Sequence, residues 1–335
     1  MRAALLPFAA LFRAGVMARN ATYDLALLAG RRLPRFAIGV GNLSVGGTGK
    51  TPLAAWFAAE LRRRGATVGI VLRGYGGDEV AEHRATNPDA AVEAAADRHV
   101  AAARAVARGA EVLVLDDCLQ RRDVTVDAML AVVSADTWAG PRWPLPAGPW
   151  REGLAALRRC DAVIVTRKAA NREVADALAR ELAPHTRGAQ AWTAALEPVT
   201  FRQLSGAPGM DPAMLAGREV VALSGIGEPE LFAEQLRRLG ARVTPLAFPD
   251  HHAFTAADIE RAASVANARW IITTAKDAVK LCDVWPQEGP ECYVAVLGVR
   301  IESGAEALGQ LLDRAATAAR TINPEAAAAL PARES

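Results

Sequence analysis

From Phe36 onward, short aliphatic runs alternate with longer stretches rich in Ala, Leu and Arg. Runs of four to eight apolar residues are typical of buried strands, and the stretches between them have the length of crossover helices. The predicted strands are residues 36–40, 68–72, 112–115, 129–133 and 162–165. Strands that alternate with helices in this way predict an α/β fold, with a mostly parallel sheet flanked by helices.

Residues 202–217 carry three glycines and two prolines, a composition that indicates a connector. After it the alternation restarts, with predicted strands at 220–223, 243–246, 270–274 and 293–297 and predicted helices at 230–239 and 256–266. We therefore predict a second, smaller α/β domain. The predicted organisation is an N-terminal helical region at 1–30, a first domain at 31–201, a linker at 202–217, a second domain at 218–320 and a disordered tail at 321–335, Ala-rich from Ala326.

The first 20 residues combine an apolar stripe with arginines. Spacings of three and four place Leu5, Phe8, Phe12 and Val16 on one face of a helix. A signal peptide is disfavoured because Arg13 and Arg19 occupy the region where small residues should precede a cleavage site. Two alternatives remain open from the pattern alone. The helix packs on the protein's own core, or it lies in a membrane interface with its arginines at the headgroups.

Composition excludes several classes of protein. The chain has 335 residues, is 51% hydrophobic, and carries a net charge of only +2, which argues against disorder and against a dedicated nucleic-acid binder. Its four cysteines are widely spaced and form no C-x-x-C pair, so neither a disulfide framework nor a zinc site is indicated. No apolar run reaches the roughly 18 residues that a membrane-spanning helix needs.

A glycine-rich loop follows the first predicted strand. Residues 46–51 read GGTGKT and precede a predicted helix with proline in its first turn. Backbone N–H groups and the helix N-terminus cradle phosphates in such loops, Lys50 reaches the β- and γ-phosphates, and the Thr51 hydroxyl ligates Mg²⁺. Ser44 stands where the strict P-loop pattern has its first glycine. The second acidic element that a P-loop requires is predicted at Asp116 and Asp117, after a buried strand.

Further polar clusters follow predicted strands, where ligands bind in open parallel sheets. They read RGYGGDE at 73–79, LPAGPWRE at 145–152, FPDHH at 248–252 and TTAKD at 273–277. Each alone is also compatible with a turn or a solvated loop. Their shared position after strands favours a single cleft.

Together these motifs resemble the tetraacyldisaccharide 4'-kinases of lipid A biosynthesis, nearly from end to end. The resemblance is carried by Arg19-Asn20 and Tyr23-Asp24, RRLP at 31–34, VGNL at 40–43, GGTGKTP at 46–52, RGYGG at 73–77, LDD at 115–117 with Leu119-Gln120, LPAGPWRE at 145–152, SGIGEP at 224–229, FPDHH at 248–252 and AKDAVK at 275–280. Members of this family similarly carry Ser or Thr in place of the first P-loop glycine.

The resemblance implies a P-loop kinase that uses ATP and Mg²⁺ to phosphorylate the 4'-hydroxyl of an acylated glucosamine disaccharide 1-phosphate. It implies monotopic attachment to the cytoplasmic face of a bacterial inner membrane. The near-balanced charge argues against a nucleic-acid partner, and we infer no obligate protein partner. The implied catalytic residues are Asp78, His251 and Lys50. The implied nucleotide-binding residues are Gly46, Gly47, Thr48, Gly49, Lys50 and Thr51. The implied metal ligands are Thr51, Asp116, Asp117 and Glu152, and the implied substrate contacts are Asn42, Arg73, Tyr75, Gln120 and Arg151.

The chain departs from the family pattern in three ways. RGYGG is fused directly to the Gly-Asp-Glu motif that carries Asp78, the segment after Asp78 is short, and Cys118 and Arg121 replace a usual Gly and His. Two other functions remain as alternatives to the lipid kinase. A membrane-surface P-loop ATPase switch needs no convergence of Asp78 and His251, and a soluble small-molecule kinase has no use for an apolar N-terminal helix.

Overall fold

The computed structural model describes residues 2–74, 77–207, 209–265, 270–286 and 288–321, without the side chains of residues 2, 3 and 78. The predicted tail from Ala326 lies outside these residues. The strands up to residue 167 are β1 (Arg31–Arg32), β2 (Phe36–Asn42), β3 (Val68–Leu72), β4 (Ala91–Ala94), β5 (Val112–Asp116), β6 (Val124–Thr125), β7 (Ala128–Ser134) and β8 (Ala162–Arg167). The helices up to residue 185 are α1 (Arg2–Asp24), α2 (Lys50–Arg63), α3 (Asp78–Thr86), α4 (Arg98–Ala107) and α5 (Arg172–Leu182), with 3₁₀ turns η1 (Leu154–Arg159) and η2 (Ala183–His185).

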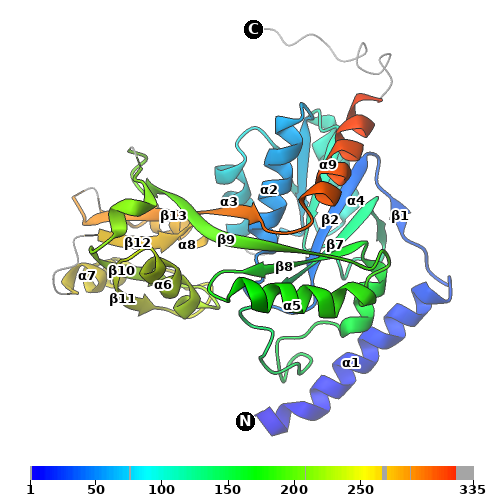
Figure 1. The fold of residues 1–335 in the computed structure, drawn as a ribbon, viewed down its shortest axis with the longest axis horizontal. Coiled ribbons are helices and arrows are strands. Elements are labelled where there is room, and N and C mark those ends of the chain that lie inside the picture. Colours follow the sequence, from blue (N-terminus) through cyan, green and yellow to red (C-terminus); the bar gives the residue numbers. More distant parts are fainter. Residues whose placement is uncertain (1, 75–76, 208, 266–269, 287, 322–335) are drawn as a thin grey trace.

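The remaining elements restart the alternation of strands and helices, as the sequence predicts. They are β9 (Gln190–Gln203), η3 (Pro212–Leu215), β10 (Glu219–Ser224), α6 (Pro229–Arg238), β11 (Arg242–Ala247), α7 (Ala256–Ser264), β12 (Trp270–Thr274), α8 (Ala275–Leu281), β13 (Glu291–Ile301) and α9 (Ala305–Arg320). One sheet runs through the whole molecule in the order β11-β10-β12-β13-β9-β8-β7-β2-β5-β3-β4 (Figure 1). The α/β fold with a mostly parallel sheet is confirmed.

Among the described residues, β9 and β13 form the one antiparallel strand pair of this sheet. β8 stops pairing with β9 at Ala195, whereas β12 stops pairing with β13 at Ala295, which lies opposite Phe201 of β9. The strands from β8 to β4 in this order form the first half of the sheet, and β11, β10 and β12 form the second half. Because the strands of the two halves run in opposite directions, their carboxyl ends face each other along the β9–β13 ladder. The stretch from Ala195 to Phe201 spans roughly 20 Å at the rise of an extended strand.

The ladder is irregular at its middle. Val296 pairs with Thr200 but Leu297 pairs with Pro198, so Val199 is an extra residue on β9. An extra residue of this kind bends the strand and increases its twist. The bulge therefore rotates the second half of the sheet relative to the first, between the two facing edges.

The last helix, α9, does not stay with the second half. It packs against α2, β2 and β5 of the first half, where Leu308, Leu311 and Leu312 join the core that contains Phe57. β9 likewise belongs to both halves of the sheet. The predicted boundaries at 201 and 320 therefore do not separate two independently covered sheets, although the domain division itself stays a prediction.

Helix α1 runs along the outside of the molecule, apart from the sheet (Figure 1). Phe8 is 61% exposed and Leu11 is 72% exposed, whereas Ala9 is buried. Of the predicted stripe, Phe8 and Phe12 are exposed, whereas Leu5 and Val16 are half-buried. The C-terminal end of the helix is anchored by Arg122, which is 2.8 Å from Asp24 and donates to the Asn20 carbonyl at 3.0 Å. Within the described residues, no helix has the length and apolar character needed to cross a membrane.

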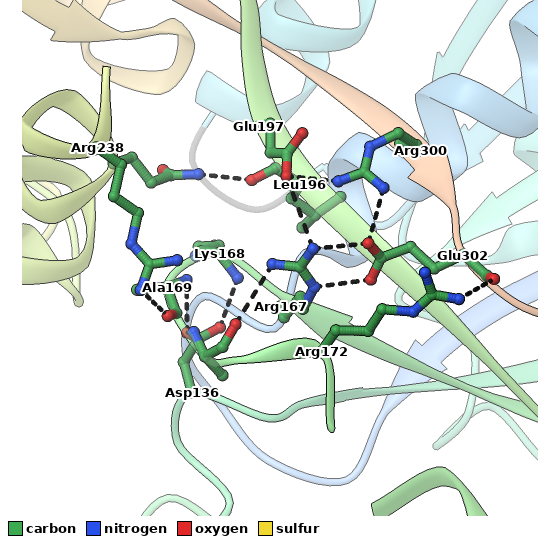
Figure 2. A network of polar contacts seen from close by, with 12 residues as sticks. Asp136, Arg167, Lys168, Ala169, Arg172, Leu196, Glu197, Arg238, Arg300 and Glu302 are labelled. Carbon is green, nitrogen blue, oxygen red and sulfur yellow. Dashed lines mark hydrogen bonds and ion pairs between the residues drawn. The ribbon is translucent and has the colours of Figure 1, made fainter. Parts of the chain in front are cut away.

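A polar network fixes the turn that follows β8 (Figure 2). Arg167 donates two hydrogen bonds to Glu302, at 2.6 and 2.7 Å, and the backbone N–H groups of Lys168, Ala169 and Ala170 all donate to the Asp136 carboxylate. The Glu302 side chain is almost fully buried. The network therefore connects the end of β8 to β7 on one side and to the segment after β13 on the other.

We predict that Glu302→Gln destabilises the protein in a pH-dependent way. The hydrogen bonds from Arg167 hold the pKa of Glu302 below its ordinary value, despite the opposing effect of burial. A lowered pKa contributes stability that is present above the unfolded-state pKa of about 4.3 and is lost as the pH falls through the folded-state pKa. The loss in free energy of unfolding should be about 1–3 kcal/mol at pH 7 and should shrink below about pH 4.

Urea denaturation at a series of pH values measures this effect. Glu306→Gln, at an exposed position in the first turn of α9, is the matched control and should change the free energy of unfolding by less than about 0.5 kcal/mol. A Glu302→Gln deficit that stays constant or grows on acidification would contradict the assignment.

Candidate active site

The phosphate loop joins β2 to α2 and is held from two strands. Gly49 caps α2 with a φ of 86°, a conformation that L side chains rarely adopt. The Asn42 amide donates to the Thr48 hydroxyl at 3.0 Å, and the Thr166 hydroxyl donates to the Thr48 carbonyl at 2.7 Å. The first N–H groups of α2 have no partner within the helix, and its positive end favours an anion. The predicted substrate residue Asn42 thus braces the loop through its side chain.

Lys50 lies at the start of α2, surrounded by carboxylates. Its ammonium is 3.9 Å from Glu79 Oε1, and its side chain is 13% exposed. Burial by itself lowers the pKa of Lys50, but the charges of Asp116, Asp117 and Glu79 outweigh this effect and hold the pKa above its ordinary value. Lys50 is therefore a fixed cation at the mouth of the phosphate loop.

Asp116 ends β5 and contacts a histidine that the sequence analysis did not single out. Asp116 Oδ2 is 3.0 Å from His83 Nε2, and both side chains are buried. Burial raises the pKa of Asp116, but the His83 contact and the Lys50 charge outweigh it, so the pKa stays below its ordinary value. Asp116 Oδ1 is also buried and has no hydrogen-bond partner among the described residues. One carboxylate oxygen thus remains available for a ligand.

Asp117 follows with a φ of 56° and turns its carboxylate toward Arg151. The Arg151 Nη1 donates to both oxygens of Asp117, at 2.7 and 2.8 Å, and lies 3.4 Å from Gln120 Oε1. Gln120 in turn donates to the Asn42 carbonyl at 3.0 Å. Four of the predicted site residues therefore form one connected group beside the phosphate loop. The metal role of Asp117 and the substrate roles of Gln120 and Arg151 stay predictions.

Glu152 is placed differently from the other predicted metal ligands. Its buried carboxylate accepts from Arg159 at 2.9 Å and from the Asn20 amide of α1 at 2.7 Å. The structure therefore brings Glu152 to the end of α1 and does not pair it with Thr51 or Asp116. Its predicted role as a metal ligand remains untested by these contacts.

His251 lies on the facing edge of the sheet, in the turn between β11 and α7. It has a φ of 62°, its side chain is 58% exposed, and its Nε2 is 3.2 Å from Lys276 Nζ of α8. Lys276 also donates to Asp250 at 2.8 Å. Burial raises the pKa of Asp250, but this bond outweighs it and holds the pKa low. The second half of the sheet thus supplies the exposed imidazole of His251 beside Lys276, which is held in place by its bond to Asp250.

Three predicted residues follow β3. Arg73 is exposed, Tyr75 lies outside the described residues, and Asp78 is the first residue of α3, its side chain outside the description. Helix α3 packs against α8 across the two halves of the sheet. Burial raises the pKa of Glu82 on this helix to about 7, while the charge of Lys276 opposes that rise. The backbone of Asp78 therefore starts a helix that lies between the phosphate loop and the His251 edge, and the pairing of Asp78 with His251 stays a prediction.

A lysine and a glutamate from opposite edges meet on the phosphate loop. Lys168, after β8, donates to the Gly47 carbonyl at 2.7 Å and to Glu228 of the second half at 3.1 Å. A β-carbon on Gly47 would lie 2.6 Å from the Glu228 carboxylate, so a larger residue there would have to displace the Glu228 side chain. A cavity of about 310 Å³ opens beside this contact, lined in part by Gly46, Trp138 and Glu228. The sequence analysis did not single out Lys168. The only feature of the sequence that could have indicated it is its position directly after a buried strand.

The residues fit a Mg²⁺ site in part. Asp116 offers a carboxylate oxygen without a partner among the described residues, and the Thr51 hydroxyl lies within hydrogen-bond reach of the same carboxylate. These are the hard oxygen ligands that Mg²⁺ prefers, and Mg²⁺ takes most of its other ligands from water and phosphates. The described part of the chain contains no cluster of three or more His, Cys, Asp or Glu side chains arranged to hold a metal. A site of this kind depends on a bound nucleotide to complete its coordination.

Comparisons with known proteins agree on one family. The family model described as tetraacyldisaccharide-1-P 4'-kinase matches residues 1–317. Among curated relatives, a tetraacyldisaccharide 4'-kinase from Aromatoleum aromaticum is 40% identical over 298 residues, covering 82% of this chain and 84% of the relative. One from an Anaeromyxobacter species (strain Fw109-5) is 38% identical over 340 residues, covering 93% and 91%.

A solved structure has a similar fold. The crystal structure of LpxK from Aquifex aeolicus in complex with ATP matches with a TM-score of 0.73 and 28% identity, covering 94% of this chain and 99% of that one. The similarity therefore extends through both halves of the sheet and is not confined to the phosphate loop.

We predict that Gly49→Ala disrupts the phosphate loop. The substitution combines a left-handed backbone with a clash, because a β-carbon there would overlap Leu196 Cδ1. Gly65→Ala is the matched control, since Gly65 has a φ of 85° with open space around it. Chemical denaturation should show a loss of about 1–2 kcal/mol for Gly65→Ala and a larger loss for Gly49→Ala. Equal losses in the two variants would contradict the tight packing of the loop against β9.

Proposed function

Since the chain belongs to the tetraacyldisaccharide-1-phosphate 4'-kinase family, we propose that it transfers the γ-phosphoryl group of ATP to the 4'-hydroxyl of an acylated glucosamine disaccharide 1-phosphate. One observation supports this proposal best. The carboxyl ends of the strands in the two halves of the sheet face each other across the β9–β13 ladder. One edge carries the phosphate loop with Lys50, and the other carries His251 and Lys276. A kinase needs a nucleotide site and an acceptor site that face each other in this way.

The phosphate side acts by position and charge. Phosphoryl transfer passes through a loose transition state, so stabilisation of negative charge supplies most of the acceleration. The Lys50 ammonium and the N-terminus of α2 are fixed before the nucleotide binds. When bound, Mg²⁺ would neutralise charge on the β- and γ-phosphates, and Thr51 and Asp116 are the residues that would hold it.

The acceptor side acts by proton transfer and orientation. We assign Asp78 as the group that takes the proton of the 4'-hydroxyl and His251 as the group that orients it, a pairing within ordinary general-base chemistry. Arg73 and Arg151 are assigned to the substrate because guanidinium groups bind phosphates through two parallel hydrogen bonds. Tyr75 is assigned to the substrate from its place in the RGYGG motif. Asn42 and Gln120 would support that site through the contacts they already make.

Helix α1 is assigned to the membrane surface. Its exposed apolar side chains match the hydrophobic face of an interfacial helix, and a lipid substrate resides in the same interface. We propose that the protein works at the cytoplasmic face of the bacterial inner membrane as a peripheral enzyme. Asn20, bound to Glu152, would connect this helix to the loop that carries Arg151.

The kinase proposal is tested by transfer of labelled phosphate from ATP to tetraacyldisaccharide 1-phosphate in detergent micelles. Lys50→Met should lower kcat/KM by at least about 100-fold, because the variant keeps the volume of the side chain and removes the charge. Asp78→Asn should lower kcat about 100- to 10,000-fold. Asp89→Asn, which alters an aspartate on the surface after α3, is the matched control and should retain activity.

The two other functions give distinct results in the same assay. An ATPase switch hydrolyses ATP without labelling the lipid, and a soluble small-molecule kinase labels a water-soluble acceptor in preference to the lipid. Either outcome, or full activity in Asp78→Asn, would contradict the assignment.

The membrane proposal is tested by flotation with vesicles that contain anionic phospholipid. A variant with serine at Phe8, Leu11 and Met17 should bind at least about 10-fold less, because burying each such side chain contributes roughly 1.5–3 kcal/mol. The control variant places serine at exposed apolar positions elsewhere, namely Val100, Val174 and Met214. Equal binding of the two variants would show that α1 is not the attachment site.

A further inference from the structure

Helix α3 contacts the phosphate site through two side chains four residues apart. Glu79 reaches Lys50 at 3.9 Å, and His83 reaches Asp116 at 3.0 Å. Residues at i and i+4 lie on the same face of a helix, one turn above the other. These two contacts therefore fix both the rotation of α3 about its axis and its distance from the phosphate site.

A neighbouring face of α3 is turned toward the second half. Asp78 and Glu82 are also four residues apart, the charge of Lys276 acts on Glu82, and α3 packs against α8. The rotation that directs His83 at Asp116 therefore also determines where the first turn of the helix lies relative to the His251 edge. Residue 78 is about 7.5 Å along the helix axis from residue 83.

The His83–Asp116 contact is costly for a purely structural role. His83 is fully buried, its Nδ1 has no hydrogen-bond partner among the described residues, and the same holds for Asp116 Oδ1. Each buried polar atom without a partner costs about 1–3 kcal/mol. Leucine would fill a core position on α3 without that cost, which points to a use for the histidine beyond packing.

The short connection before α3 increases the need for such a contact. β3 ends at Leu72 and α3 begins at Asp78, so the connection between them is short and rich in glycine. Gly77, the N-cap residue, has a φ of 69° and makes no side-chain capping bond. The start of the helix is thus not fixed by a cap, and the side chains further along the helix must position it.

We propose that His83 is a positioning residue: by binding Asp116 it fixes α3 on the phosphate site and so places the first turn of that helix, which begins at Asp78, between the two facing edges. The inference rests on the proposed function, because it assigns to His83 the placement of the group that receives the acceptor proton. The proposed role depends on the hydrogen bond that His83 Nε2 donates to Asp116 and on the direction of that bond. It does not depend on the charge of the imidazole.

Two variants separate the hydrogen bond from the volume of the side chain. His83→Leu removes the donor, and His83→Gln keeps an amide N–H near the position of Nε2. His83→Leu should lower kcat about 10- to 100-fold while KM for ATP changes less than about 3-fold, because a misplaced group affects the transfer step and not nucleotide binding. His83→Gln should retain at least about a third of kcat.

His99→Leu is the matched control, since His99 also contacts an aspartate, Asp97, at 3.3 Å but lies on α4 beside Arg31. It should leave kcat unchanged. Equal loss of kcat in the leucine and glutamine variants, or no loss in either, would overturn the proposal, as would a KM for ATP that rises in parallel with the fall in kcat. If His83→Leu does not fold, His83→Asn takes its place, because its amide is too short to reach Asp116.

Hydrogen exchange followed by mass spectrometry tests the positioning without any kinase assay. Amides 79–84 should exchange at least about 10-fold faster in His83→Leu than in the wild type and in His83→Gln, with amides of α4 unchanged. Unchanged exchange in His83→Leu overturns the proposal. If the wild type shows no lipid kinase activity but exchange responds as expected, the proposed function fails and the docking of α3 stands.

Discussion

The antiparallel pairing of β9 with β13 determines where every functional group of this protein can lie. Parallel sheets place their ligand sites at carboxyl ends of strands. Two parallel half-sheets joined side by side in the same direction would place these ends along one common edge. Here they run in opposite directions and are staggered along two long strands, so the edges face each other across roughly 20 Å of β9. The bulge at Val199 twists one half relative to the other within that interval.

The electrostatic arrangement follows from this geometry. The phosphate side gathers three carboxylates, Asp116, Asp117 and Glu79, around Lys50. Arg151 neutralises Asp117, and the oxygen of Asp116 that has no partner is left at the loop. Such an excess of negative charge is poorly suited to ATP alone and well suited to ATP with a divalent cation. The opposite edge provides Lys276 and His251, which favour a negatively charged or hydroxyl-bearing acceptor.

The sequence alone predicted much of the fold because buried parallel strands are continuous aliphatic runs, such as residues 112–115. The phosphate loop was equally visible, since its glycines and Lys50 are local features. The long β9 was not predicted, because its antiparallel partner β13 is distant in the sequence and its own pattern is interrupted by Pro198. The partner of Glu152 on α1 and the contact between His83 and Asp116 were missed for the same reason. Both depend on where distant segments meet, and nothing in the local sequence encodes that meeting.

The return of α9 to the first half has a consequence for synthesis on the ribosome. This helix covers apolar side chains that pack with β2 and β5, strands that are made more than 180 residues earlier. The core around the phosphate loop therefore stays open until α9 has been made, and the second half must be made, and can fold, before the first is closed. Until then, the face of β2 and β5 that α9 covers is a hydrophobic surface that a chaperone would be expected to shield during translation.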